Sequence, residues 1–280
     1  MNTPLTTATL KVTGASLHYE VRGSGPLLVI IPGGPQDAGV FAELAERLAD
    51  RYRVVAFDLR GNSRSSFDGP AVDLDVDVHA DDVARLIEEL GGGSAYIFGT
   101  SGGAQIGLNL AARHPGKVKV LVAHEPPSVM MLDDPSEALA ADRALHETYR
   151  REGVDAAMAA FFAMSGLDDG NAQDGPPPFD IRPEAAETFE RVSGNFEYWL
   201  AHGLLPLSLY EPDVEALKAG APKVVVALGE ASVGQPIHEM GSALARMLGI
   251  DPVPFPGDHM GFEQDARAFA DQLHRSFAAQ

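Results

Sequence analysis

Two patterns of hydrophobic positions divide the chain. Residues alternate between apolar and polar in TATLKV and SLHYEVRG, which TGA separates, and this predicts an opening β-hairpin with one buried face. Short continuous apolar runs are typical of strands buried on both faces of a parallel sheet. Such runs occur at 27–32, 53–58, 95–99, 118–125 and 223–230.

Helical periodicity fills the intervals between these runs. It is present in FAELAERLAD, VHADDVARLIEELG, AQIGLNLAARHP and IHEMGSALARMLG. Because strand and helix alternate, right-handed βαβ units are expected. The sequence therefore predicts an α/β fold with a mostly parallel, doubly wound sheet covered by helices on both faces.

The alternation is interrupted between about residues 127 and 217, where the pattern is helical or loop-like. A structureless loop of that length is uncommon inside a compact domain. We therefore expect an inserted helical cap at 127–217, on a core formed by 1–126 and 218–280. Strand and helix resume after the cap and end in the amphipathic DARAFADQLHRSFA.

Composition narrows the class of protein. The 280 residues are 45% hydrophobic and 22% charged, as in ordinary globular proteins, and the formal net charge is -19. That charge argues against binding to nucleic acid or to anionic membrane surfaces. The first residues, MNTPLTTATLKV, do not have the pattern of a signal peptide, so a cytoplasmic location is expected. A homodimer is compatible with the sequence.

The stretch IFGTSGGAQIG carries the first candidate for chemistry. Gly99, Ser101 and Gly103 have the G-x-S-x-G spacing of a nucleophile elbow, and they lie between a predicted strand and a predicted helix. In that context the serine stands on a strained turn that exposes its hydroxyl. Ser101 is thus the predicted nucleophile.

An attacking serine needs a base and donors for the oxyanion. IPGGPQDAG follows the strand at 27–32, and its Gly34 amide is one predicted donor beside the Gly102 amide. His259, in FPGDHMGF, lies between the last strand and the last helix, as expected for the base in the order serine, acid, histidine. The other histidines fall in helical patterns, the hairpin, the cap or a strand end: His18, His79, His114, His124, His146, His202, His238 and His274.

These motifs together resemble the α/β-hydrolase superfamily over nearly the whole chain. IPGGP corresponds to the family's His-Gly-x-Pro loop, DLRGNSRS to its Asp-x-x-Gly-x-Gly-x-Ser turn, and GTSGG to the elbow. Pro32 replaces the usual histidine of the first motif, and Asn62 and Ser63 vary the second. The resemblance implies the α/β-hydrolase fold and a serine hydrolase.

The usual motif for the catalytic acid is missing from this sequence. Hydrolases of this fold commonly carry an aspartate shortly after the strand KVVVALG, but this chain reads GEASVGQ, with Ser232 near that place. Glu125 ends the preceding strand, and the prolines of HEPP stop the chain there from continuing as strand or helix. Glu125 is the favoured acid, and Glu230 is the alternative.

The elbow, HE-x-P, the aspartate-free GEASVGQ and the cap motif NFEYW together resemble the zearalenone lactonases. That resemblance implies a triad of Ser101, Glu125 and His259, with Trp199 facing the substrate. The expected reaction is hydrolysis of a carboxylic ester or lactone through an acyl-enzyme, with a zearalenone-type macrolactone as one candidate substrate. The alternatives are a ligand-binding receptor with little turnover and related triad activities, namely carbon–carbon hydrolase, perhydrolase and amidase.

Apolar side chains of the cap can line a pocket for an apolar or aromatic substrate. The candidates are Met130, Phe161, Phe162, Tyr198 and Trp199. A small-molecule ester or lactone is the expected partner. No cofactor is expected, and no metal, since the sequence holds no HExxH motif or cluster of metal ligands.

Overall fold

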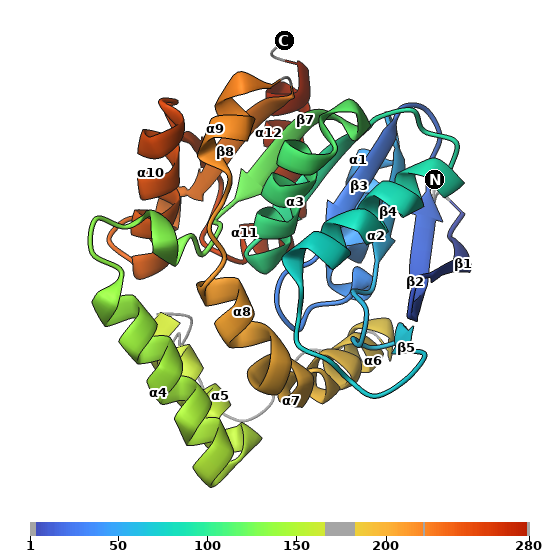
Figure 1. Cartoon of the computed structure of the whole chain (residues 1–280). Coiled ribbons are helices and arrows are strands. Elements are labelled where there is room, and N and C mark those ends of the chain that lie inside the picture. Colours follow the sequence, from blue (N-terminus) through green and yellow to red (C-terminus); the bar gives the residue numbers. More distant parts are fainter. Residues whose placement is uncertain (1–3, 166–182, 221, 279–280) are drawn as a thin grey trace.

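A computed structural model describes residues 4–165, 183–220 and 222–278 (Figure 1). Nine strands in these residues form one sheet, in the order β1-β2-β4-β3-β6-β7-β8-β9, with β5 paired to β2. The strands are β1 (Thr6–Val12), β2 (Ala15–Arg22), β3 (Leu27–Ile31), β4 (Arg53–Phe57), β5 (Ser66–Phe67), β6 (Ala95–Thr100), β7 (Val118–His124), β8 (Lys223–Gly229) and β9 (Val253–Phe255).

Strand direction follows the sequence pattern. The hairpin β1–β2 is antiparallel, and β2 also pairs antiparallel with β4. From β4 through β3, β6, β7 and β8 to β9, every pairing is parallel. The predicted α/β-hydrolase fold with a mostly parallel sheet is therefore confirmed.

Alternate residues of the central strands enter two separate hydrophobic cores, one on each face of the sheet. Val29 and Ile31 of β3 pack in one core, whereas Leu28 and Ile30 pack in the other. The first core lies under α2 (Val76–Glu89), α3 (Gly102–Arg113) and α10 (Pro236–Leu248). The second lies under α1 (Ala42–Leu48), α11 (Gly261–Gln264) and α12 (Ala266–Ala278).

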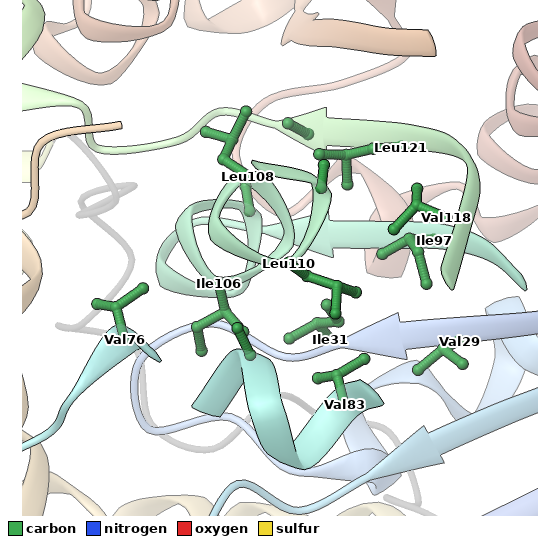
Figure 2. Packing of buried hydrophobic residues seen from close by; sticks show 14 of the residues in the cluster. Val29, Ile31, Val76, Val83, Ile97, Ile106, Leu108, Leu110, Val118 and Leu121 are labelled. Atoms are coloured by element: carbon green, nitrogen blue, oxygen red, sulfur yellow. The ribbon is translucent and has the colours of Figure 1, made fainter. Parts of the chain in front are cut away.

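Figure 2 shows the first core from close by, with Ile31 of β3 near Ile106 and Leu110 of α3 and Val83 of α2. All five residues of β3 are buried, which explains its unbroken apolar run. The helices above begin and end at local signals. Asp75 accepts hydrogen bonds from the first amides of α2, and α10 ends at Gly249 in the left-handed conformation.

The described part of the inserted segment is helical. Figure 1 shows α4 to α8 together beyond one end of the sheet. These helices are α4 (Ser136–Glu152), α5 (Val154–Ser165), α6 (Pro183–Gly194), α7 (Phe196–Tyr198) and α8 (Leu204–Ser208), and α9 (Val214–Ala219) leads back to β8. A small core of their own side chains joins α4 and α5 to α8, through Leu145, Met158 and Leu204. Residues 166–182 of the predicted cap lie outside the described residues. We refer to α4–α8 below as the cap helices.

The start of α3 lies close against β3, and this approach sets the position of the elbow. A Cβ placed on Gly103 would lie 2.2 Å from the carbonyl oxygen of Ile31 and 2.4 Å from that of Pro32. Both obstacles are backbone atoms of a buried strand end, so they cannot move aside cheaply.

Gly103→Ala is therefore expected to destabilise the protein by about 1–3 kcal/mol or more, as overpacking of a filled core does. Urea denaturation followed by circular dichroism measures this free energy of unfolding. The matched control is Gly116→Ala, since Gly116 is exposed and a Cβ there would meet nothing within 4 Å. Equal stability of the two variants would contradict the assigned close approach.

Candidate active site

Ser101 stands at the sharp turn between β6 and α3. Its φ of 53° and ψ of -128° are strained for a residue with a side chain. The turn is held in place because the Ser101 amide donates to the His124 carbonyl at 2.9 Å. Gly99 permits the turn, since a Cβ there would lie 2.4 Å from the Gly103 carbonyl oxygen. The strand–turn–helix context expected of a nucleophile elbow is thus present.

Backbone strain is concentrated around this edge of the sheet. In the described part of the chain, three non-glycine residues have positive φ: Ser63 at 48°, Ser101 at 53° and Glu125 at 43°. Such conformations cost free energy and persist where the surrounding structure enforces them, often at functional sites. Glu125 directly follows β7, and Ser101 follows the paired strand β6.

Glu125 and His259 form a buried pair. The Glu125 carboxylate is 0% exposed, and its Oε2 lies 2.8 Å from His259 Nδ1. Its other oxygen, Oε1, accepts from the Gly229 amide at 2.8 Å. Burial acts to raise the pKa of Glu125, but the hydrogen bond from His259 and the field of that ring outweigh it and lower that pKa to about 2.

The ionised carboxylate fixes the tautomer of His259. A carboxylate only accepts hydrogen bonds, so Nδ1 of His259 carries the proton that it donates to Glu125. Nε2 is then the nitrogen left to accept a proton from a reacting group. This is the relation of acid to base that a serine nucleophile requires.

His124 packs directly against His259. The two rings stack at 6.1 Å between centroids and 20° between planes. His124 is fully buried among aromatic rings, and burial lowers its pKa to about 3, so the ring is neutral. Its Nδ1 lies 3.0 Å from the Thr100 hydroxyl. A buried, neutral ring therefore neighbours His259.

Ser101 and His259 lie at the same edge of the sheet without a direct hydrogen bond. The hydrogen bonds among the described residues include none between the Ser101 hydroxyl and His259. Contacts between nucleophile and base are often long in an unliganded enzyme and tighten when substrate binds. The partly exposed Ser101 side chain is open to this adjustment.

The loop after β3 brings the Gly34 amide close to the elbow. The Gly34 nitrogen lies 3.5 Å from the place that a Cβ on Gly102 would occupy. Two side-chain amides shape this loop: Gln36 accepts from the Gly33 amide at 3.0 Å, and Asn62 donates to the Gly34 carbonyl at 3.0 Å. The two predicted oxyanion donors are thus close together.

Two cap side chains cover these amides. Trp199 Nε1 would lie 3.3 Å from a Cβ on Gly34, and Leu207 Cδ1 would lie 2.8 Å from a Cβ on Gly102. Trp199 begins a π-helical turn, Trp199–Gly203, and such turns are frequent at functional sites. The ring of Phe161 meets Trp199 edge-on at 4.9 Å. The cover over the site is therefore apolar and aromatic.

The remaining predicted residues lie elsewhere. Tyr198 packs on Phe67 and donates to the Val72 carbonyl. Met130 packs against the core under α2, α3 and α10. Phe162 is 39% exposed. Glu230 is exposed, and the described hydrogen bonds include none between it and His259.

Several residues near the site could not be recognised as site residues from the sequence pattern. Leu207 is one of many apolar residues of the cap, and His124 is a histidine at a strand end. Asn195, from the turn between α6 and α7, bonds to the oxyanion loop across more than a hundred residues of chain. Ser232 is buried close to Glu125, since both would lie within 3.0 Å of a Cβ on Gly229. These roles arise from contacts between distant segments.

The part of the chain that the structure describes offers neither a metal site nor a membrane-spanning helix. The described residues hold no group of three or more His, Cys, Asp or Glu side chains that could bind a metal ion. Within the same ranges, every helix is too short or too polar to cross a bilayer.

Comparison with known proteins identifies the family of the chain. The family described as the alpha/beta hydrolase fold matches residues 26–165. A hydrolase of Bacillus subtilis strain 168, the uncharacterized YraK, is 35% identical over 272 residues, which span 95% of this chain and 94% of that protein. The chain belongs to the α/β-hydrolase family and is a hydrolase.

Two more distant proteins are similar to this chain, one over part of its sequence and one in its fold. A zearalenone hydrolase of Cladophialophora bantiana is 33% identical over 118 residues, 41% of this chain and 44% of that protein. The crystal structure of an enol-lactonase from Burkholderia xenovorans LB400 superposes with a TM-score of 0.75 at 19% identity. That match covers 97% of this chain and 100% of the enol-lactonase, and it shows a shared fold.

The low pKa of Glu125 predicts a dependence of stability on pH. A carboxyl whose pKa falls from 4.5 to about 2 on folding stabilises the protein above pH 4.5, and this stability is lost as the pH falls from 4.5 to 2. Its size is about 3 kcal/mol. Glu125→Gln is therefore expected to lose less stability than the unsubstituted protein between pH 6 and pH 3, as measured by urea denaturation.

Glu230→Gln is the control, because Glu230 is exposed. This variant is expected to follow the unsubstituted protein over the same pH range. If the free energy of unfolding of Glu125→Gln fell with pH as steeply as that of the other two proteins, the Glu125 carboxyl would not be held ionised by its surroundings.

Proposed function

We propose that this hydrolase is a serine carboxylic ester hydrolase, an esterase or lactonase that works through an acyl-enzyme. Ser101 is the nucleophile, His259 the base and Glu125 the acid that orients it. The observation that carries the proposal is the buried Glu125–His259 pair, 2.8 Å apart, at the sheet edge where Ser101 stands on its strained turn.

The reaction follows from these positions. Ser101 Oγ attacks the ester carbonyl carbon while His259 Nε2 takes the hydroxyl proton. The carbonyl oxygen becomes an oxyanion, which the amides of Gly34 and Gly102 stabilise. The carbon–oxygen bond to the alcohol part then breaks, and His259 returns its proton to the departing alkoxide.

Hydrolysis of the acyl-enzyme reverses the roles. A water molecule gives a proton to His259 and attacks the acyl carbon, the bond to Ser101 Oγ breaks, and Oγ regains the proton. The products are a carboxylic acid and an alcohol, or one hydroxy acid when the substrate is a lactone. Throughout, Glu125 stabilises the protonated His259.

Glu125 is favoured over Glu230 as the acid on three grounds. It is buried, it accepts from His259, and its other oxygen is held by the Gly229 amide. The Gly229 amide reaches Glu125 from the end of β8, the strand after which hydrolases of this fold commonly carry their aspartate. The end of β8 therefore donates a hydrogen bond to the carboxylate of Glu125, the residue that follows β7.

The surroundings of Ser101 favour a neutral, apolar substrate. The cover consists of Trp199 and Leu207, with Phe161 behind Trp199. The arginines around the oxyanion loop are engaged with carboxylates, since Arg64 pairs with Asp58 and Arg191 with Asp37. Two similar proteins are named as an enol-lactonase and a zearalenone hydrolase, which supports including lactones among the candidate substrates.

The choice of acid is tested by a pair of substitutions. Glu125→Gln is expected to lower kcat by about 10³-fold or more, because the glutamine amide no longer stabilises the protonated base. Glu230→Gln is expected to change kcat by less than about twofold, as exposed substitutions usually do little. Steady-state kinetics on p-nitrophenyl butyrate give both values, and equal losses would overturn the assignment of Glu125.

The reaction class is tested with a substrate panel and a covalent probe. We expect turnover of neutral esters and lactones, zearalenone included, with product masses one water heavier than each lactone. A fluorophosphonate is expected to label the unsubstituted protein, whereas Ser101→Ala neither labels nor turns over. Binding of the panel without turnover or labelling would instead identify a receptor, and hydrolysis confined to amides would identify an amidase.

A further inference from the structure

One side chain of the cap is bonded entirely to the core. Asn195 lies between α6 and α7 and is 5% exposed. Its Oδ1 accepts from the Ser63 amide at 2.7 Å, and its Nδ2 donates to the Ser63 hydroxyl and to the Pro35 carbonyl, each at 2.8 Å. A carboxamide offers one oxygen and two N–H donors, so the whole group is engaged.

The first partner of Asn195 is a strained residue. Ser63 has a φ of 48°, in the left-handed region that favours glycine. It lies in DLRGNSRS, the turn that follows β4. Because Asn195 bonds to both the amide and the hydroxyl of Ser63, the cap stabilises a backbone conformation that serine otherwise disfavours.

The second partner belongs to the loop that carries Gly34. Asn195 holds the Pro35 carbonyl, and Asn62, next to Ser63 in the strained turn, holds the Gly34 carbonyl at 3.0 Å. The Gly34 N–H shares a peptide plane with the Gly33 carbonyl, which accepts from the Gln36 amide at 2.9 Å. The bonds to the Gly34 and Pro35 carbonyls hold the two residues inside this turn, and so they help to fix the conformation in which the Gly34 N–H is set.

A neighbouring ion pair joins the same two segments. Arg191 of α6 donates through Nε to Asp37 at 2.6 Å, and the Asp37 carboxylate, 0% exposed, also accepts from the Gly39 amide at 2.8 Å. The loop from Pro35 to Gly39 is thus bonded to the cap helices at two places. Both contacts are made within three residues of Gly34 along the chain.

We propose that Asn195 is a positioning residue of the cap that helps to aim the Gly34 amide of the oxyanion hole, through its bond to the Pro35 carbonyl inside the turn from Gly33 to Gln36 and through the strained Ser63 turn. The inference rests on the proposed ester hydrolysis. The oxyanion hole is then complete when the cap helices are seated on the loop, the arrangement in which Trp199 covers Gly34. Docking of the cap and stabilisation of the transition state are thereby coupled.

Three substitutions distinguish the effect of Asn195 on the oxyanion loop from its effect on the Ser63 turn. Asn195→Asp keeps an acceptor for the Ser63 amide but loses both N–H donors. Ser63→Gly removes the strain, because glycine adopts a positive φ readily. Asp73→Asn is the matched control: by removing the carboxylate charge it weakens another contact between cap and core, the pairing of Asp73 with His202 at 2.8 Å, which does not reach the oxyanion loop.

Asn195→Asp is expected to lower kcat on p-nitrophenyl butyrate about 10- to 100-fold with KM changed less than about threefold. The expected loss is no larger than that caused by removing an entire oxyanion donor, which costs about 10²–10³-fold. It falls on kcat because a contact made in the transition state affects kcat rather than KM. Adding Ser63→Gly to Asn195→Asp is expected to restore thermal stability but not kcat. Asp73→Asn is expected to retain kcat.

Full recovery of kcat in the double variant would overturn the inference, because Asn195 would then act by stabilising the turn alone. An equal loss in Asp73→Asn would overturn it too, by assigning the effect to cap docking in general.

A second measurement does not depend on turnover. In protein labelled with ¹⁵N-glycine, the amide resonance of Gly34 is expected to shift in Asn195→Asp and to stay in place in Asp73→Asn. An unmoved Gly34 resonance in Asn195→Asp would overturn the inference whatever the kinetics. Turnover that survives Ser101→Ala would instead overturn the proposed function, so the two failures are distinguishable.

Discussion

A carboxylate removed from water needs compensation from hydrogen bonds and nearby charge, and the buried Glu125 receives both. His259 and the Gly229 amide occupy its two oxygens, so three segments far apart in sequence meet at one group. The end of β7, the end of β8 and the loop after β9 are held together there. The position of His259 relative to the elbow follows from this junction, and so does the ionised state on which the proposed chemistry depends.

The other half of the site depends on backbone carbonyls. The Gly34 amide can serve an oxyanion only if the loop after β3 holds one conformation, and a loop with a glycine at positive φ has little intrinsic preference. Asn62 and Asn195 supply the restraint by bonding to the carbonyls of Gly34 and Pro35. The proposed acid and base are therefore positioned by the ends of the strands and the loop after β9, whereas the proposed oxyanion donor is positioned by a turn and a cap residue.

Much of this arrangement could be predicted from the sequence, because it follows the order of elements along the chain. The hairpin, the parallel strands and the place of Ser101 and His259 at strand ends need only periodicity and chain order. Asn195, Leu207 and the π-helical turn at Trp199 could not be predicted in this way. Their roles come from side-chain contacts across segments more than a hundred residues apart, and one polar or apolar residue in a helical pattern looks like the next. The adjacent Tyr198 and Trp199 illustrate the limit, since they face different neighbours.

The strained Ser63 bears on how the caps of such hydrolases can be exchanged. A cap grafted from a relative would bring new apolar lining, but without an amide at the position of Asn195 it would leave the Ser63 N–H and the Pro35 carbonyl without their present partners. Cap and core are in this sense a matched pair. A chimera with glycine at residue 63 would accept caps from a wider range of relatives. Glycine adopts a positive φ readily, so the turn would no longer depend on hydrogen bonds from the cap.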